Sequence, residues 1–397
     1  MWIEELLELN IDTVRFVLFA SVAAGVVVYL RLRISEAGTL TAGYLVILGL
    51  SGRAGVIAMT LASALVAYLV ARLLLTRYLG LTKPWLFVAT VAAGSISTTI
   101  FQLAVRETGP LELPWGLSLI LYAGSFIIPG LIAYDVARQG FRNTAIGLML
   151  AIGGALVIVV PILALAEWLQ PESTTPYIST TGEIPENLFW LASLATVFFS
   201  GAVRLSFGLR TGGFIAPLFI VEVFSWSALV TIFAAAIAAH LIASWLKERV
   251  VWSPRLRFQF TVMIGAMAAW TGLYWGSVLG WEPALAANSF ALEPLLAVAL
   301  VASDMGRSDS SIGRTMLGAL AAVAFIFAVL GLVAIGGAAG IALCVIFLIG
   351  LPLLLLIPGS QAIRRDWIRA IEAGREVAAG SPRVRSGASP HSGNEVR

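Results

Sequence analysis

Residues 126–140, FIIPGLIAYDVARQG, begin inside an apolar run and end in charge. Pro129 and Gly130 stand where a membrane helix would otherwise continue, because proline lacks a backbone N–H and glycine allows conformations that other residues avoid. In lipid, irregular backbone is tolerated only where it packs against protein or lines a watery cavity. Asp135 and Arg138 are three residues apart, so on a helix they share a face and can pair. The stretch therefore predicts a helix that breaks at Pro129–Gly130 and faces neighbouring helices or a cavity rather than lipid. Its end carries an Asp and an Arg that can pair.

The composition excludes a soluble domain. The 397 residues are 59% hydrophobic and 12% charged, whereas soluble domains carry about 25% charged residues. Apolar runs of about 20 residues recur, which is the length of a transmembrane helix. The short alternating segments of a membrane β-barrel do not occur in the sequence. We therefore predict an all-α polytopic integral membrane protein. Its hydrophobic segments, about 13 in number, are 13–31, 38–50, 54–75, 84–104, 115–134, 143–166, 187–205, 211–222, 224–246, 257–279, 289–304, 312–334 and 336–358.

The distribution of charge predicts the orientation, because Lys and Arg collect in the cytoplasmic loops of membrane proteins. Acidic residues such as Glu167 and Glu172 fall in a loop on the other side. This pattern places the N-terminus outside and the C-terminus in the cytoplasm. Segments 38–50 and 211–222 are short for a full crossing, so we expect half-helices or re-entrant pieces there. The basic clusters are Arg31/Arg33, Arg72/Arg77/Lys83, Arg138/Arg142, Arg204/Arg210, Lys247/Arg249/Arg255/Arg257, Arg307/Arg314 and Arg364/Arg365/Arg369.

Two stretches carry a family resemblance. IPGLIA at 128–133, followed by Asp135 and by RQG at 138–140, resembles a segment of the membrane protein of bacterial poly-γ-glutamate synthesis, the PgsC/CapC family. GTLTAGYL at 38–45 resembles an earlier segment of that family, with Ala42 where the family has proline. The resemblance covers roughly residues 30–155.

The resemblance implies a non-catalytic membrane subunit, without a cofactor, in a complex that makes and exports a capsule-type anionic polymer. Its implied partners are an ATP-dependent amide ligase, other membrane subunits of polymer synthesis and the polymer itself. The implied location is the lipid bilayer of the bacterial cell membrane.

The chain also repeats itself. RTGGFIAPL at 210–218 echoes EAGTLTAGY at 36–44, which places Pro217 opposite Gly43. LVASD at 300–304 with Arg307 echoes LIAYD at 131–135 with Arg138, and Glu293-Pro294 echoes Pro129-Gly130. An even number of segments in each unit gives both units the same orientation, which predicts a pseudo-two-fold axis along the membrane normal. The expected domains are a first membrane repeat (1–166), an external acidic loop (167–186), a second repeat (187–335), an extra helix (336–359) and a cytoplasmic amphipathic segment with a disordered basic tail (360–397).

The candidate functional residues are polar groups at or inside the membrane segments, because such groups are costly in lipid. The sequence contains no phosphate-binding loop, zinc-protease motif or nucleophile elbow, so we assign no catalytic residue and no metal ligand. We expect a substrate path or docking surface for a partner at Asp135, Arg138, Gln139, Arg142, Asp304, Arg307 and Arg314. We expect helix breaks around a pathway at Gly43, Pro129, Gly130, Pro217 and Pro294.

Plainer interpretations stay open for each group. An Asp–Arg pair at a solvated helix end contributes little, and Gly and Pro in membrane helices are often packing features. Glu222 fits an external turn, Gln259 a helix end, and His240 a tightly packed interface.

Three functions are compatible with these features. The first is a membrane subunit of poly-γ-glutamate synthesis and export. The second is a stand-alone secondary transporter of a small anion or amino acid, and the third is a structural scaffold without a pathway. Nucleic-acid binding has no support, because the basic residues are spread among loops in the way that membrane topology requires.

Overall fold

The computed structural model of the chain describes residues 11–38, 40–76, 83–106, 118–169, 184–185, 188–249, 254–278, 292–307 and 310–355. Each predicted hydrophobic segment corresponds to a helix, and the last two segments share α14, which turns at Gly337 (φ 53°). Among the described residues, six helices are long and apolar enough to cross a membrane, so the predicted helical membrane protein is confirmed. The helices are α2 (Ile11–Leu32), α3 (Thr41–Leu50), α4 (Ala54–Val70) continued by the π-helix η1 (Ala71–Thr76), α5 (Lys83–Arg106), α6 (Ser118–Gln139), α7 (Phe141–Leu169), α8 (Phe189–Phe207), α9 (Ala216–Glu222), α10 (Trp226–Arg249), α11 (Pro254–Val278), α13 (Leu292–Met305) and α14 (Ile312–Leu355).

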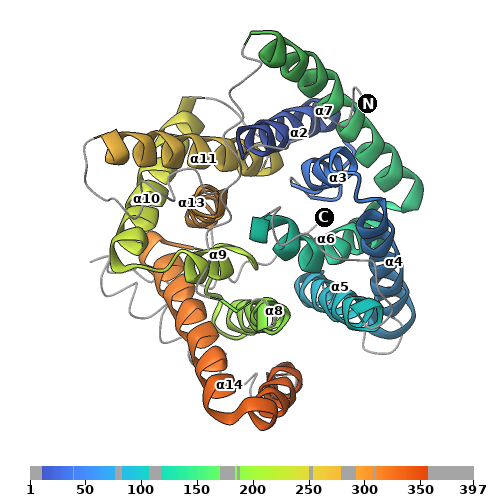
Figure 1. The fold of residues 1–397 in the computed structure, drawn as a ribbon, viewed down its shortest axis with the longest axis vertical. Coiled ribbons are helices and arrows are strands. Elements are labelled where there is room, and N and C mark those ends of the chain that lie inside the picture. Colours follow the sequence, from blue (N-terminus) through green and yellow to red (C-terminus); the bar gives the residue numbers. More distant parts are fainter. Residues whose placement is uncertain are drawn as a thin grey trace, which may run out of the picture.

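The helices form two similar halves around the centre of the molecule (Figure 1). α2 packs on α7 as α8 packs on α14, and α5 packs on α6 as α11 packs on α13. Across the halves, α5 contacts α8 while α11 contacts α2, and α6 meets α13. Such reciprocal contacts are those that a two-fold axis generates. The predicted pair of repeats is therefore confirmed. The proposed domain limits stay predictions, because 170–183 and 356–397 lie outside the described residues, and with them most of the acidic loop and the whole basic tail.

The structure corrects the register of the repeat by one residue. α2 and α8 end at Leu32 and Phe207, and α3 and α9 begin the same number of residues later, at Thr41 and Ala216. Before each short helix the backbone takes positive φ at two successive residues, at Ala37-Gly38 (63° and 109°) and at Gly212-Gly213 (82° and 82°). The sequence comparison aligned Gly212 with Gly38, whereas the turn aligns it with Ala37. Pro217 therefore stands opposite Ala42 rather than Gly43, and Arg210 stands opposite Ser35.

α3 and α9 are the short helices that the sequence predicts. At about 1.5 Å per residue, the 10 residues of α3 span roughly half of a hydrocarbon core about 30 Å thick. The chain ahead of α3 enters the protein interior, where Ser35, Glu36 and Ala37 are buried. Glu222 ends α9 at a turn, as predicted, but its side chain is buried rather than external.

α6 continues through Pro129 and Gly130, so the predicted break is wrong. Proline leaves the carbonyl four residues earlier without its helical donor. Here that carbonyl belongs to Ser125, and the Thr98 hydroxyl of α5 donates to it at 3.1 Å. Ser95 of α5 donates to the next carbonyl, that of Phe126, at 2.8 Å. The prediction that this stretch faces protein is confirmed, because Phe126 is fully buried.

The other predicted breaks do not interrupt a helix either. Gly43 lies within α3, where a Cβ would come 2.4 Å from the Ser21 hydroxyl oxygen, so it is a packing glycine. Pro217 and Pro294 lie in the first turns of α9 and α13. Proline is tolerated there because those N–H groups have no helical acceptor.

Replacing Gly130 by alanine should lower the free energy of unfolding by about 1–3 kcal/mol, the usual cost of overpacking. The added Cβ would lie 2.4 Å from Val91 Cα, so α5 and α6 would have to separate. Denaturant titration in mixed micelles measures the effect. Gly153→Ala in α7 is the matched control, because nothing lies within 4 Å of its added methyl group. An equal loss in both variants would contradict the proposed close approach of α5 and α6.

Candidate functional site

A cavity of about 480 Å³ lies between the two halves. Its size falls within the range of small-ligand pockets, about 300–1,000 Å³. Helices of both halves line it (α2, α3, α5 and α6 of the first, α8, α9, α11 and α13 of the second), together with the chain segments that precede α3 and α9. Much of the lining is apolar, including Leu18, Ile47, Ile128 and Leu296. The charged residues of the lining are Asp135, Arg138, Arg204, Arg210, Asp304 and Arg307.

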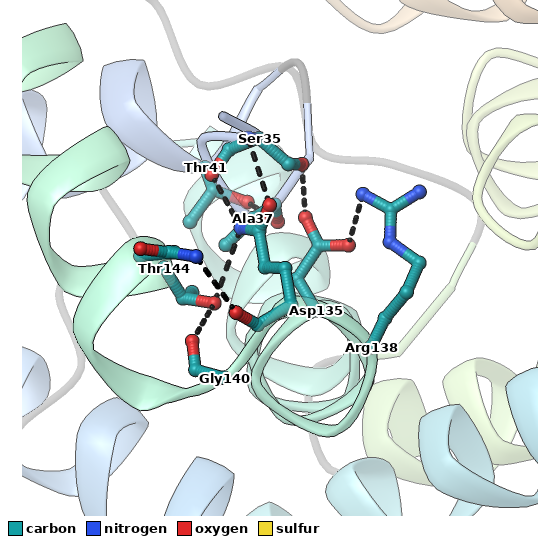
Figure 2. Close-up of polar contacts among 9 residues, drawn as sticks. Ser35, Ala37, Thr41, Asp135, Arg138, Gly140 and Thr144 are labelled. Carbon is teal, nitrogen blue, oxygen red and sulfur yellow. Dashed lines mark hydrogen bonds and ion pairs between the residues drawn. The ribbon is translucent and has the colours of Figure 1, made fainter. Parts of the chain in front are cut away.

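The first half contributes an Asp–Arg pair from the last turn of α6. Arg138 Nη2 lies 2.9 Å from Asp135 Oδ1, and the Ser35 hydroxyl donates to the other carboxylate oxygen. Figure 2 shows the carboxylate between these two donors. The Asp135 side chain is 8% exposed, whereas that of Arg138 is 48% exposed. Arg138 therefore reaches water while Asp135 stays inside.

Gln139 holds the chain ahead of α3 against the end of α6. Its Oε1 accepts from the Ser35 backbone N–H at 3.0 Å, and its Nε2 donates to the Ser35 carbonyl at 2.8 Å. The same Nε2 lies 3.2 Å from the Thr144 hydroxyl of α7. Gln139 does not line the cavity, so it positions Ser35 beside Asp135 instead.

The second half repeats the pair with a different third partner. Arg307 Nε lies 3.1 Å from Asp304 Oδ1, and the Gly213 backbone N–H donates to Oδ2 at 2.9 Å. Arg210 Nη1 lies 3.4 Å from Oδ1, and its side chain and that of Asp304 are each 9% exposed. A buried arginine thus occupies the place that Ser35 has in the first half.

The presence of Arg210 in place of Ser35 gives the two halves of the cavity lining different net charges. The first half supplies Asp135 and Arg138, whose charges cancel. The second half supplies three arginines and one aspartate, a net charge of +2. Its extra arginine on α8, Arg204, lies over the Phe87 ring at 5.6 Å. The positive side of the cavity is therefore formed by the second half.

The family model for capsule biosynthesis CapC matches residues 20–145 and again 195–316. The chain belongs to the CapC family. No protein of curated function and no solved structure matched it. Each match contains one short-helix turn and one Asp–Arg pair, so this CapC chain carries the family unit twice. In the corrected register, Pro217 of the second unit stands opposite Ala42 of the first.

The CapC structure brings four of the predicted site residues to one cavity: Asp135, Arg138, Asp304 and Arg307. Two further predicted site residues, Arg142 and Arg314, lie outside the cavity lining, as Gln139 does. Arg142 is exposed in the first turn of α7. Arg314 Nη2 donates to the Phe207 carbonyl at 3.3 Å and so caps the C-terminal end of α8.

The sequence interpretation missed Ser35, Arg204 and Arg210 as residues of the CapC cavity. Both arginines looked like ordinary positive charges of a cytoplasmic loop. The position of Arg210 directly before the Thr-Gly-Gly turn could have identified it as a cavity residue. The sequence alignment instead paired Arg210 with Glu36, one residue away from its true counterpart, Ser35.

A buried hydrogen bond joins the two halves. Gln259 of α11 donates through Nε2 to Glu36 Oε1 at 2.9 Å, and both residues are fully buried. Gln259 lies near the start of α11, as expected, but its side chain is buried in the interface between the halves rather than solvated. Glu36 is missing from the predicted site residues, because a glutamate at the end of an apolar segment usually lies in water.

Proposed function

We propose that this chain is the membrane subunit of a complex that synthesises and exports poly-γ-glutamate. It would bind and conduct the polymer without catalysing its formation. An ATP-dependent amide ligase would form the amide bonds, and other membrane subunits would complete the complex. The observation that carries the proposal is that the CapC family model matches both halves, and that both halves direct an Asp–Arg pair into one cavity.

A conduit is what the physical problem requires. A chain of carboxylates cannot cross about 30 Å of hydrocarbon unaided, because each charge is costly there. A protein-lined cavity with arginines at one end supplies charges of the opposite sign. The basic residues at that end favour a cytoplasmic mouth under the positive-inside rule, with the N-terminus outside and the C-terminus inside. Arg142, exposed in the first turn of α7 and four residues after Arg138, is a candidate docking residue for the ligase.

Deletion of the gene tests the proposal. Surface polymer would be released, hydrolysed and analysed for γ-linked glutamate under conditions in which the polymer is made. We expect loss of the polymer and its recovery when the intact gene is returned. An unchanged surface would overturn the proposal.

A stand-alone transporter of a small anion or amino acid is the second candidate. The cavity volume of about 480 Å³ suits a small ligand, and parallel repeats occur in transporters. Purified protein in liposomes discriminates between the two functions. Solute uptake driven by an ion gradient, without any partner subunit, would favour the transporter.

A further inference from the structure

We propose that one polymer chain binds along the second half of the cavity, on a wall made of Ser200 and Arg204 of α8 together with Arg210 and Arg307. The inference rests on the proposed function for the class of ligand, a chain of γ-linked glutamates with successive carboxylates. It adds that the two halves have different tasks: the second binds carboxylates, and the first forms the opposite, electrically neutral side.

α8 directs two polar side chains into the cavity. Ser200 and Arg204 are four residues apart on this helix, so they share one face, and both line the cavity. Ser200 is 3% exposed, and its hydroxyl has no hydrogen-bond partner among the described residues. Leaving such a group unpaired in the interior costs free energy. A ligand oxygen or amide in the cavity would satisfy it.

The equivalent helix of the first half offers nothing similar. α2 contributes only the apolar Leu18 to the lining among the described residues. The difference between α2 and α8 adds to the exchange of Ser35 for Arg210. Both differences place the positive charge on the same half.

The arginines of the wall are arranged so that carboxylates can be bound. Asp304 holds the buried Arg210 in place. Arg307 approaches Asp304 through Nε, which leaves its two terminal nitrogens directed elsewhere, and its side chain is 42% exposed at the mouth. Arginine presents several donors in a fixed plane and binds carboxylates in pairs of hydrogen bonds. Successive carboxylates of one chain can therefore meet Arg307, which follows α13, and Arg204 in the last turn of α8.

A symmetric pair of sites would bind two chains equally well. The uneven wall favours one chain along one side, which gives the duplicated subunit a single path. With two identical units, the cavity would have two equivalent polymer sites. With unequal halves, it would have one.

Binding of a fluorescently labelled γ-glutamyl oligomer to the full-length protein tests the inference. The protein would be placed in nanodiscs of neutral phosphatidylcholine, and affinity measured by fluorescence polarisation. Arg204→Gln should weaken binding about 10-fold, because a charge-assisted hydrogen bond is lost. Ser200→Ala should weaken it about 3-fold, because a neutral hydrogen bond is lost. Arg204→Lys keeps the charge and should bind more tightly than Arg204→Gln.

Arg31→Gln is the matched control, because Arg31 is an exposed cation in the last turn of α2, outside the cavity lining. Its affinity should stay within about 2-fold of the parent protein, since surface charges contribute little. An equal loss in Arg31→Gln and Arg204→Gln would overturn the wall in favour of general surface attraction. Competition by free glutamate as effective as that by unlabelled oligomer would overturn recognition of a chain. Absence of oligomer binding would overturn the inference alone, because the deletion experiment judges the proposed function separately.

Discussion

Replacing Asp304 by alanine should lower the free energy of unfolding by about 3–5 kcal/mol, the cost of breaking a buried ion pair. The change removes the carboxylate that Arg210 contacts, and only 9% of the Arg210 side chain is exposed. The Gly213 N–H also loses its acceptor. Arg307 contributes less to the loss, because its side chain is 42% exposed and can turn to water.

The same change at Asp135 is the matched comparison and should cost only about 1–2 kcal/mol. Arg138 is 48% exposed, so its charge is solvated without Asp135. The main loss is the acceptor of the buried Ser35 hydroxyl. Denaturant titration in mixed micelles, followed by tryptophan fluorescence, compares the two variants.

A third variant tests whether the buried charge of Arg210 causes the loss of stability in Asp304→Ala. Arg210→Ser combined with Asp304→Ala removes the buried cation and should recover most of the lost stability. Equal losses in Asp304→Ala and Asp135→Ala, or no recovery in the double variant, would contradict the role of Arg210 as a buried charge.

The helical membrane architecture was predictable because it depends on local quantities. Apolar length and low charge mark each helix, and recurrence of the Asp–Arg spacing marks the two units. The helix through Pro129 was not predictable, because its continuity depends on hydroxyls of α5. Thr98 and Ser95 supply donors to the carbonyls of Ser125 and Phe126. Nothing in the sequence near Pro129 reports them.

The candidate site was predictable only where each half carries the same local pattern. Asp135/Arg138 and Asp304/Arg307 are repeated along the chain, and the structure places all four at one cavity. Arg204 has no counterpart among the cavity-lining residues of α2, so the repeat does not reveal it. Arg210 was not recognised as the counterpart of Ser35, because matching the glycines of the two copies gave an alignment that was wrong by one residue. The backbone φ angles of the two turns give the correct alignment. The features that make the halves unequal are therefore those that repeat analysis overlooks.

The double variant Arg138→Ala, Arg307→Ala should abolish polymer output while the protein remains folded in the membrane. These arginines are the two exposed cations of the cavity lining that pair with its carboxylates. Each aspartate keeps another donor after the change. Asp135 retains the Ser35 hydroxyl, and Asp304 retains Arg210 and the Gly213 N–H. The change therefore removes charge from the mouth and leaves each aspartate with a hydrogen-bond donor, while the Asp135 carboxylate loses the arginine that it pairs with.

The measurement is γ-linked glutamate released from the cell surface, alongside the amount of the protein in the membrane fraction. Arg31→Ala with Arg72→Ala is the control, because both arginines are exposed and lie outside the cavity lining. It removes the same number of positive charges and should leave output near the parent level. Normal output from Arg138→Ala, Arg307→Ala would exclude the mouth as a site of polymer binding. The conduit would then be excluded, and the scaffold and the stand-alone transporter would be the two functions left to distinguish.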